Sequence, residues 1–137
     1  MYAVAGDTIS NTATLGYTVS GVPQTDVPSN TVDFVDDRRI NFVVAEVGNA
    51  TTSVVPGGLA QVQTFTVTNL GNDTQDFLLA ALNRATGTAD PHAGANDIFD
   101  ATNVNVYVET ANAGFAAADD TGIFIDNLAA GASATVY

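Results

Sequence analysis

The residues that could do chemistry in this chain are mainly acidic, and they are concentrated in two stretches that lack strand patterning. The first loop offers side-chain oxygens at Glu109, Asn112, Asp119 and Asp120. Calcium takes about six to eight oxygen ligands at once, so this loop is a candidate calcium site, although five alanines stand where further ligands would be wanted. The alternative is a solvated turn in which Asp and Asn accept hydrogen bonds from backbone N–H groups.

A second acidic loop spans residues 83–100, and the same two interpretations apply to it. Its oxygen-bearing side chains are Asp90, Asn96, Asp97 and Asp100. His92 follows Pro91 in this loop and is the only histidine of the chain. A single His without Cys or a second His is a poor metal site, and no Gly-x-Ser-x-Gly sequence supplies an activated serine. We therefore expect that the protein is not an enzyme.

The composition excludes further kinds of chemistry and of partner. The 137 residues include 15 Asp or Glu, 3 Arg, no Lys and no Cys, for a formal net charge of -12. Without Cys there is no disulfide or thiolate metal site, and without Lys there is no isopeptide crosslink. Three Arg cannot neutralise a run of phosphates, so we expect no nucleic-acid partner. No apolar run approaches the ~20 residues that span a bilayer, so we expect no membrane insertion.

The elements that must position these loops are β-strands. Asp supplies 13 of the 15 acidic residues, and Asp favours turns whereas Glu favours helix surfaces. Apolar and Thr or Ser residues alternate from Thr8 to Val19, which predicts one long half-buried strand, and residues 31–35 are its expected hairpin partner. Further strands are predicted at residues 40–47, 52–55, 61–68, 75–82, 103–109, 122–126 and 132–136.

Short strands separated by turns at this spacing predict an all-β fold, namely an Ig-like antiparallel β-sandwich with an N-terminal β-hairpin or extension. We expect the hairpin in residues 1–37 and the sandwich in residues 38–137, with the charge run Asp36–Arg39 at the junction. The last predicted strand is still alternating at Tyr137. The sandwich is therefore expected to lack its last strand and to leave an unpaired edge there.

Several Thr-, Asn- and Gly-rich segments occur in an order that resembles a known class of domain. These segments are Thr8–Thr14, Gly21–Gln24, Ser29–Val32, Val44–Gly48, Val54–Gly57, Phe65–Asn69, Gly71–Asp73 and Leu128–Thr135. Together they are similar to the Ig-like repeat domains of large secreted bacterial surface proteins of the adhesin and extracellular-matrix type. Similar sequences carry an apolar residue in place of Asp36 and continue beyond Tyr137. The resemblance implies an extracellular location on a bacterial surface and a calcium-type loop at residues 109–120, degenerate in this chain.

A sandwich that lacks a strand can be completed by an extended segment of another subunit. The stretch from Thr8 to Val19 is long, uncharged and alternating, so we predict that it enters a neighbouring copy and that the chain polymerises into an extracellular fibre. The residues predicted at this interface are Ile9, Ala13, Leu15, Tyr17, Val19 and Val136. No cofactor is required for this role.

Three alternatives to the fibre subunit stay open at this point. In the first, the hairpin packs on its own body, and the chain is one bead beside neighbouring domains of a longer surface protein. In the second, the chain is an adhesive or ligand-binding module of such a protein, with calcium as a stabilising ion. In the third, the chain is an accessory domain of a secreted enzyme.

Overall fold

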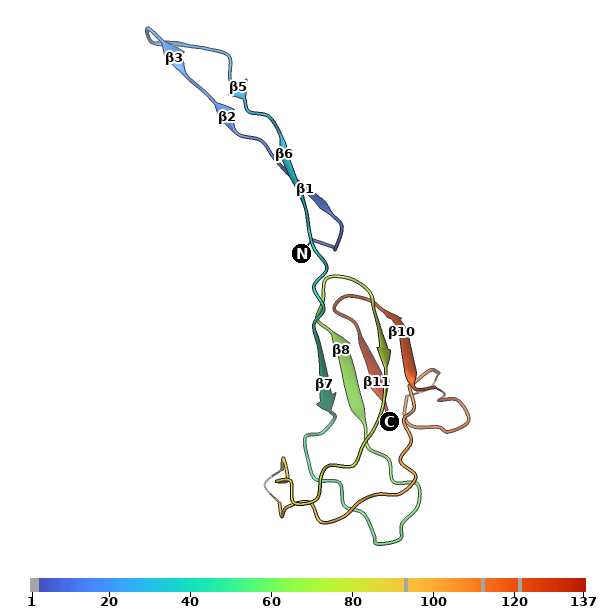
Figure 1. Cartoon of the computed structure of the whole chain (residues 1–137). Coiled ribbons are helices and arrows are strands. Elements are labelled where there is room, and N and C mark those ends of the chain that lie inside the picture. The colour runs from blue at the N-terminus through green and yellow to red at the C-terminus, as the bar shows by residue number, and fades with distance from the viewer. Residues whose placement is uncertain (1–2, 93, 112, 121) are drawn as a thin grey trace. The chain divides into compact units, whose positions relative to one another are not determined.

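The computed structural model describes residues 3–92, 94–111, 113–120 and 122–137, and within these ranges the fold is all-β (Figure 1). This confirms the predicted fold class, because the strands pair in antiparallel sheets throughout. The chain divides into two compact units, Met1–Arg39 and Ile40–Tyr137, which we call the hairpin unit and the body unit. The described residues contain no helix with the length and apolar character needed to span a bilayer.

The hairpin unit is an irregular two-stranded antiparallel ribbon. Its outgoing strand comprises β1 (Thr8–Asn11), β2 (Thr14–Leu15) and β3 (Thr18–Val19), and its returning strand comprises β4 (Val22–Pro23), β5 (Val27–Pro28) and β6 (Val32–Val35). β1 pairs with β6, β2 with β5 and β3 with β4. The chain reverses at Ser20 and Gly21, whose φ angles are 51° and 81°. Positive φ at both central residues is typical of the type I′ turn, which matches the twist of the flanking strands.

The returning strand carries one extra residue at each of two places. Residues 12–13 of the outgoing strand face residues 29–31, and residues 16–17 face residues 24–26. Each extra residue acts as a β-bulge and shifts the side-chain alternation by one position. Val22, Val27 and Val32 are five residues apart, so the two bulges bring all three valines to one face of the ribbon.

The prediction of one long, half-buried strand over Thr8–Val19 is wrong in two respects. The ladder is interrupted at both bulges, so the outgoing strand consists of three short segments. All residues of these segments are exposed rather than half-buried. The physical reason is that a two-stranded ribbon has no second layer against which either of its faces could pack.

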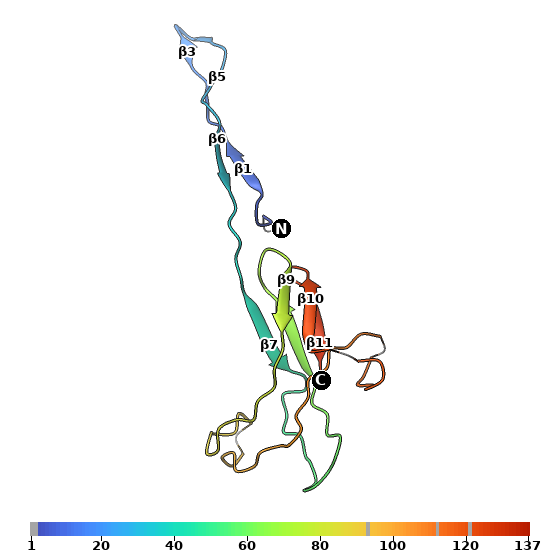
Figure 2. The same ribbon diagram turned by 45° about the vertical axis from the view of Figure 1, so that its right-hand side comes forward.

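The body unit contains two antiparallel sheets (Figures 1 and 2). The first has the strand order β11-β8-β7 and is formed by β7 (Phe42–Glu46), β8 (Phe65–Asn69) and β11 (Ser133–Val136). The second pairs β9 (Gln75–Leu78) with β10 (Phe124–Leu128). The long connections that follow β7 and β9 gather at one end of this unit in both views.

The core of the body unit lies where the inner faces of its two sheets meet. Val67 and Val136 of the first sheet and Ile125 of the second are buried, and Val108 joins them. Asn69 is only 1% exposed, and its side-chain amide donates to the backbone oxygens of Asp73 at 2.8 Å and Leu128 at 2.9 Å. It therefore connects the end of β8 with the second sheet.

The body unit differs from the prediction in its strands and in its unpaired edge. Residues 52–55 form no strand, and within residues 103–109 only a bridge from Val108 to Val136 is present. A segment with alternating apolar residues becomes a strand only where another segment is available to pair with it. The predicted unpaired edge at the last strand is wrong, because β11 pairs with β8 on one side and with residues 107–109 on the other. In the described chain, the strand at the end of this sheet is β7.

Candidate functional site

Five of the predicted interface residues share one face of the hairpin unit. Ile9, Ala13, Leu15, Tyr17 and Val19 occupy odd positions of the outgoing strand, and alternate side chains of a strand point to the same side. The register adds four residues of the returning strand that were not among those predicted: Val22, Val27, Val32 and Phe34. We call these nine residues the hairpin apolar face. The three valines are spaced five residues apart, which in a regular strand would place them on alternating faces. Their common face can be recognised only when the bulge between each pair is known.

The hairpin apolar face is exposed along its whole length. The exposed fraction of its larger side chains runs from 38% for Ile9 to 63% for Leu15. Thr8, Ser10, Thr14 and Thr18 occupy the opposite, polar face. An isolated two-stranded hairpin is marginally stable in water. An exposed apolar surface of this extent, interrupted by Asn11 opposite Val32, indicates an interaction site.

Val136, the sixth predicted interface residue, lies elsewhere. It pairs with Phe65 of β8, and its side chain is 6% exposed within the core of the body unit. It is therefore not accessible to another subunit, and it plays no part in the assembly proposed below.

The acidic loop of the body unit is closed by one buried carboxylate. Asp120 is 1% exposed, and its two side-chain oxygens accept hydrogen bonds from the backbone N–H groups of Thr110 (3.2 Å) and Ala116 (2.7 Å). The Thr110 hydroxyl donates to the backbone oxygen of Asp119 at 2.5 Å. A buried charge is tolerated when its oxygens are hydrogen-bonded, so these contacts hold the two ends of the loop together.

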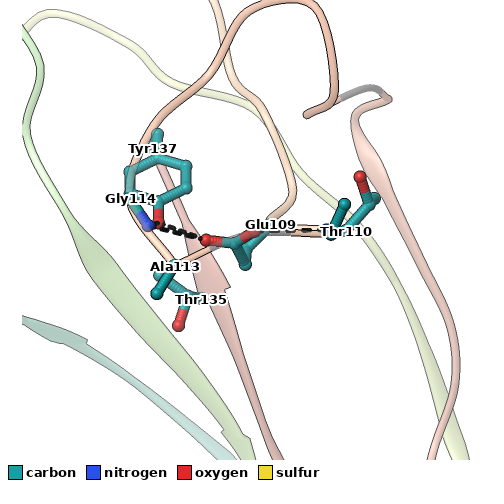
Figure 3. A pocket seen from close by; sticks show the side chains of 7 residues that line it. Glu109, Thr110, Ala113, Gly114, Thr135 and Tyr137 are labelled. Carbon is teal, nitrogen blue, oxygen red and sulfur yellow. Dashed lines mark hydrogen bonds between the residues drawn. The ribbon is translucent and has the colours of Figure 1, made fainter.

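A second carboxylate, Glu109, lines an open pocket of about 330 Å³ between the first residues of this loop and the end of β11, at Thr135 and Tyr137. Figure 3 shows the Glu109 and Tyr137 side chains pointing toward one another beside Gly114. The Tyr137 hydroxyl donates to Glu109 at 2.6 Å, and the Gly114 N–H lies 3.1 Å from both the carboxylate and the phenol oxygen. Phe115 contacts the rings of Tyr107 and Tyr137, with centroids 5.2 and 5.6 Å away.

The hydrogen bond to Glu109, and after it partial desolvation, raises the pKa of the Tyr137 phenol above its ordinary value of 10.0, while the Gly114 N–H acts in the opposite direction. A raised pKa favours the neutral phenol in the folded state, so its stabilising contribution is complete below pH 10 and is lost as pH rises through the folded-state pKa. We expect Glu109→Gln to lower the pKa of Tyr137. Titration of the phenolate absorbance, with Tyr137→Phe as the reference, measures this, and an unchanged pKa in Glu109→Gln would contradict the assignment.

Three of the calcium ligands predicted in this loop, Glu109, Asp119 and Asp120, are among the described residues, and they form no metal-binding group. Glu109 and Asp120 each accept backbone N–H groups, the Asp119 backbone accepts from Thr110, and Asn112 lies outside the described residues. The residues that the structure describes contain no group of three or more His, Cys, Asp or Glu side chains that could hold a metal ion. The geometry thus favours the interpretation of this loop as a turn whose carboxylates accept backbone N–H groups, with Asp120 buried rather than solvated, and calcium binding stays a prediction.

The second acidic loop also uses its side chains internally. Asp90 and Asp97 accept backbone N–H groups two residues ahead, at His92 and Phe99. The His92 ring nitrogen Nε2 lies 2.8 Å from Glu46, which also accepts a hydrogen bond from Gln63 at 2.6 Å. His92 therefore attaches this loop to the end of β7, which is a structural role.

No protein-family model, curated protein or solved structure matches the chain. The geometry of the chain itself is therefore the basis for the function proposed below.

Proposed function

We propose that this protein is a structural subunit of a bacterial extracellular fibre or surface assembly, and that it polymerises by β-strand addition between copies. The observation that carries the proposal is the exposed hairpin apolar face on a ribbon of only two strands. The extracellular bacterial setting is part of the proposal, and it is supported by the Thr-, Asn- and Asp-rich composition together with the resemblance described above.

The accessible surface of the chain supports this proposal. Two separate compact bodies with the sizes of the hairpin and body units would expose about 7,900 Å² in total. The protein exposes 9991 Å², so the excess is about 2,000 Å². An excess of this kind is expected for a two-stranded ribbon that no second layer covers, and it leaves apolar surface available to a partner.

The chemistry of the chain limits how such a polymer is held together. With no Cys and no Lys, the chain forms neither disulfides nor Lys isopeptide bonds. Subunits that carry a net charge of -12 also repel one another, and salt screens this repulsion over a distance of about 8 Å at physiological ionic strength. Backbone pairing and buried apolar faces are what remains to provide cohesion.

A matched pair of variants tests the proposal by electron microscopy. Leu15→Asp places a charge on the hairpin apolar face, whereas Thr25→Asp adds the same charge at an exposed residue of the returning strand, outside that face. We expect filaments from the unmodified protein and from Thr25→Asp at physiological ionic strength. Leu15→Asp should remain unassembled, because burial of an unpaired carboxylate is costly. Normal filaments from Leu15→Asp would contradict a role for this face.

A further inference from the structure

The two edges of the hairpin ribbon differ in their capacity to pair with another strand. Three cross-strand hydrogen bonds set the phase of the ladder: Asp36 N–H to Asp7, Ser29 N–H to Ala13, and Gln24 N–H to Tyr17. Bonded and non-bonded pairs alternate in an antiparallel ladder. The peptide groups of the odd-numbered outgoing residues therefore point toward the returning strand. Those of Thr8, Ser10, Thr14 and Thr18 point away from it, to the outer edge.

The returning edge is obstructed at the corresponding positions. Pro28 is opposite Thr14, Pro23 is opposite Thr18, and Asp33 is opposite Ser10. Proline has no N–H to donate, and prolines and charges at an edge are established means of preventing strand addition. The outgoing strand contains neither proline nor a charged residue from Thr8 to Val19. Only the outgoing edge thus offers an unobstructed series of backbone donors and acceptors.

A second pairing edge is present in the body unit, at β7. Leu70 donates to Asn41 and Val47 donates to Thr64, so the odd-numbered residues of β7 bond to β8. The peptide groups of Phe42, Val44 and Glu46 consequently point away from β8, on the side where β7 has no neighbour among the described strands.

The side chains of β7 are incompletely covered. Phe42 and Val44 lie on the inner face, as their partners Asn69 and Val67 do, yet they remain 53% and 55% exposed. The Phe42 ring contacts Phe77 of the second sheet, with a centroid distance of 5.4 Å. The inner layer of the sandwich therefore extends as far as β7 but is only partly covered there. No charge or proline occurs from Ile40 to Ala45.

We infer that the outgoing edge, Thr8–Val19, of one copy adds as a strand to the β7 edge, Phe42–Glu46, of another copy. This inference rests on the proposed function and specifies which edges meet. Outward peptide groups recur every second residue on both strands, so their hydrogen bonds can match. In an antiparallel addition, residues with outward peptide groups would stand directly opposite one another, and the Thr-rich face would share the inner layer with Phe42 and Val44. In a parallel addition the two sets are offset by one residue, so the hairpin apolar face lies beside Phe42 and Val44 and the Thr-rich face stays on the solvent side. The added strand is therefore assigned the parallel orientation.

Proline substitution tests the donor edge. Ser10→Pro and Asp33→Pro change two residues that face each other in the ribbon, and each removes one outward N–H without removing a hydrogen bond of the hairpin. Ser10→Pro should raise the critical concentration for filament assembly by about tenfold, as expected for one lost interface hydrogen bond. Asp33→Pro should leave it unchanged, and it controls for the effect of proline on the ribbon.

Cysteine crosslinking tests the acceptor edge, and the absence of native Cys makes it specific. Full chains with Ile9→Cys, Leu15→Cys or Val19→Cys, which sample the length of the outgoing strand, are mixed with size-tagged chains that carry Phe42→Cys or Val44→Cys, and are then oxidised. We expect mixed disulfides from at least one of these pairs, because directly opposite residues of paired strands bring Cα atoms within about 7 Å. Leu78→Cys, at an exposed residue on the outer face of β9, is the control and should not crosslink with Leu15→Cys.

The possible results separate this inference from the proposed function. If Ser10→Pro assembles normally while Leu15→Asp does not, the outgoing edge is the wrong donor although the hairpin still drives assembly. If crosslinks form only between two Leu15→Cys chains, hairpins pair with each other and β7 is not the acceptor. If the unmodified protein forms no filaments at all, the proposed function itself fails.

Discussion

Replacing Asn69 with alanine is expected to destabilise the body unit by about 2–4 kcal/mol. The Asn69 amide donates to the backbone oxygens of Asp73 and Leu128, and its side-chain oxygen accepts the Gly71 N–H at 2.9 Å. Alanine leaves all three backbone groups without this partner at a site where Asn69 is 1% exposed. Each unsatisfied buried group costs about 1–3 kcal/mol, and partial access to water reduces the sum.

Thermal unfolding measures this effect. A loss of this size should lower the melting temperature of a unit of about 100 residues by roughly 10–20 °C. Asn105→Ala is the control, because Asn105 is exposed and its amide makes one hydrogen bond, to the Asn103 backbone oxygen at 3.1 Å. That variant should stay within about 0.5 kcal/mol of the unmodified protein. Equal melting temperatures for the two variants would show that Asn69 does not hold the sheets together.

Removing residues 1–39 is expected to abolish assembly while the body unit remains folded. The core residues Val67, Val108, Ile125 and Val136 all belong to residues 40–137, so the body unit retains its own apolar cluster. The truncated chain loses the hairpin apolar face and the outgoing edge together. It should therefore sediment as a monomer under conditions in which the full chain forms filaments.

Circular dichroism and sedimentation velocity together make this result interpretable. A β-type spectrum with a cooperative melt shows that the truncated chain is folded, and full-length Thr25→Asp shows that a change in the hairpin unit does not in itself prevent assembly. Filaments formed by a folded body unit alone would assign the polymer contacts to the body and would contradict the donor role of the hairpin.

Strand locations in the body unit were largely predictable, because each depends on residues close together in the chain. β7, β8, β9, β10 and β11 each overlap a segment that was predicted from alternation. Residues 103–109 show the limit of this reasoning: Val104, Val106 and Val108 alternate, but only Val108 has a bridge to another strand. Alternation of apolar residues shows that a segment could form a strand. Whether it does so depends on a pairing strand from elsewhere in the chain, which alternation does not reveal.

The candidate sites were predictable to different degrees. The outgoing half of the hairpin apolar face follows directly from alternation at Ile9, Leu15 and Val19. The contribution of Val27 and Val32 did not follow, because it depends on the bulges that shift the register of the returning strand. The acidic loop was correctly located as a loop, and the sequence left its carboxylates open as calcium ligands or as acceptors of backbone N–H groups. In the fold, Glu109 and Asp120 accept backbone N–H groups.

Composition and alternation alone establish the all-β class, the turns and the kinds of chemistry that this chain lacks, because these properties depend on residue type and near neighbours. Which edges are left unpaired is a property of the tertiary structure. β11 lies between two neighbours, β7 lies at the end of its sheet, and the prolines of the returning strand fall on its outer side. Each of these facts depends on pairing between segments that are distant in sequence, and such pairing sets the surfaces available to another copy.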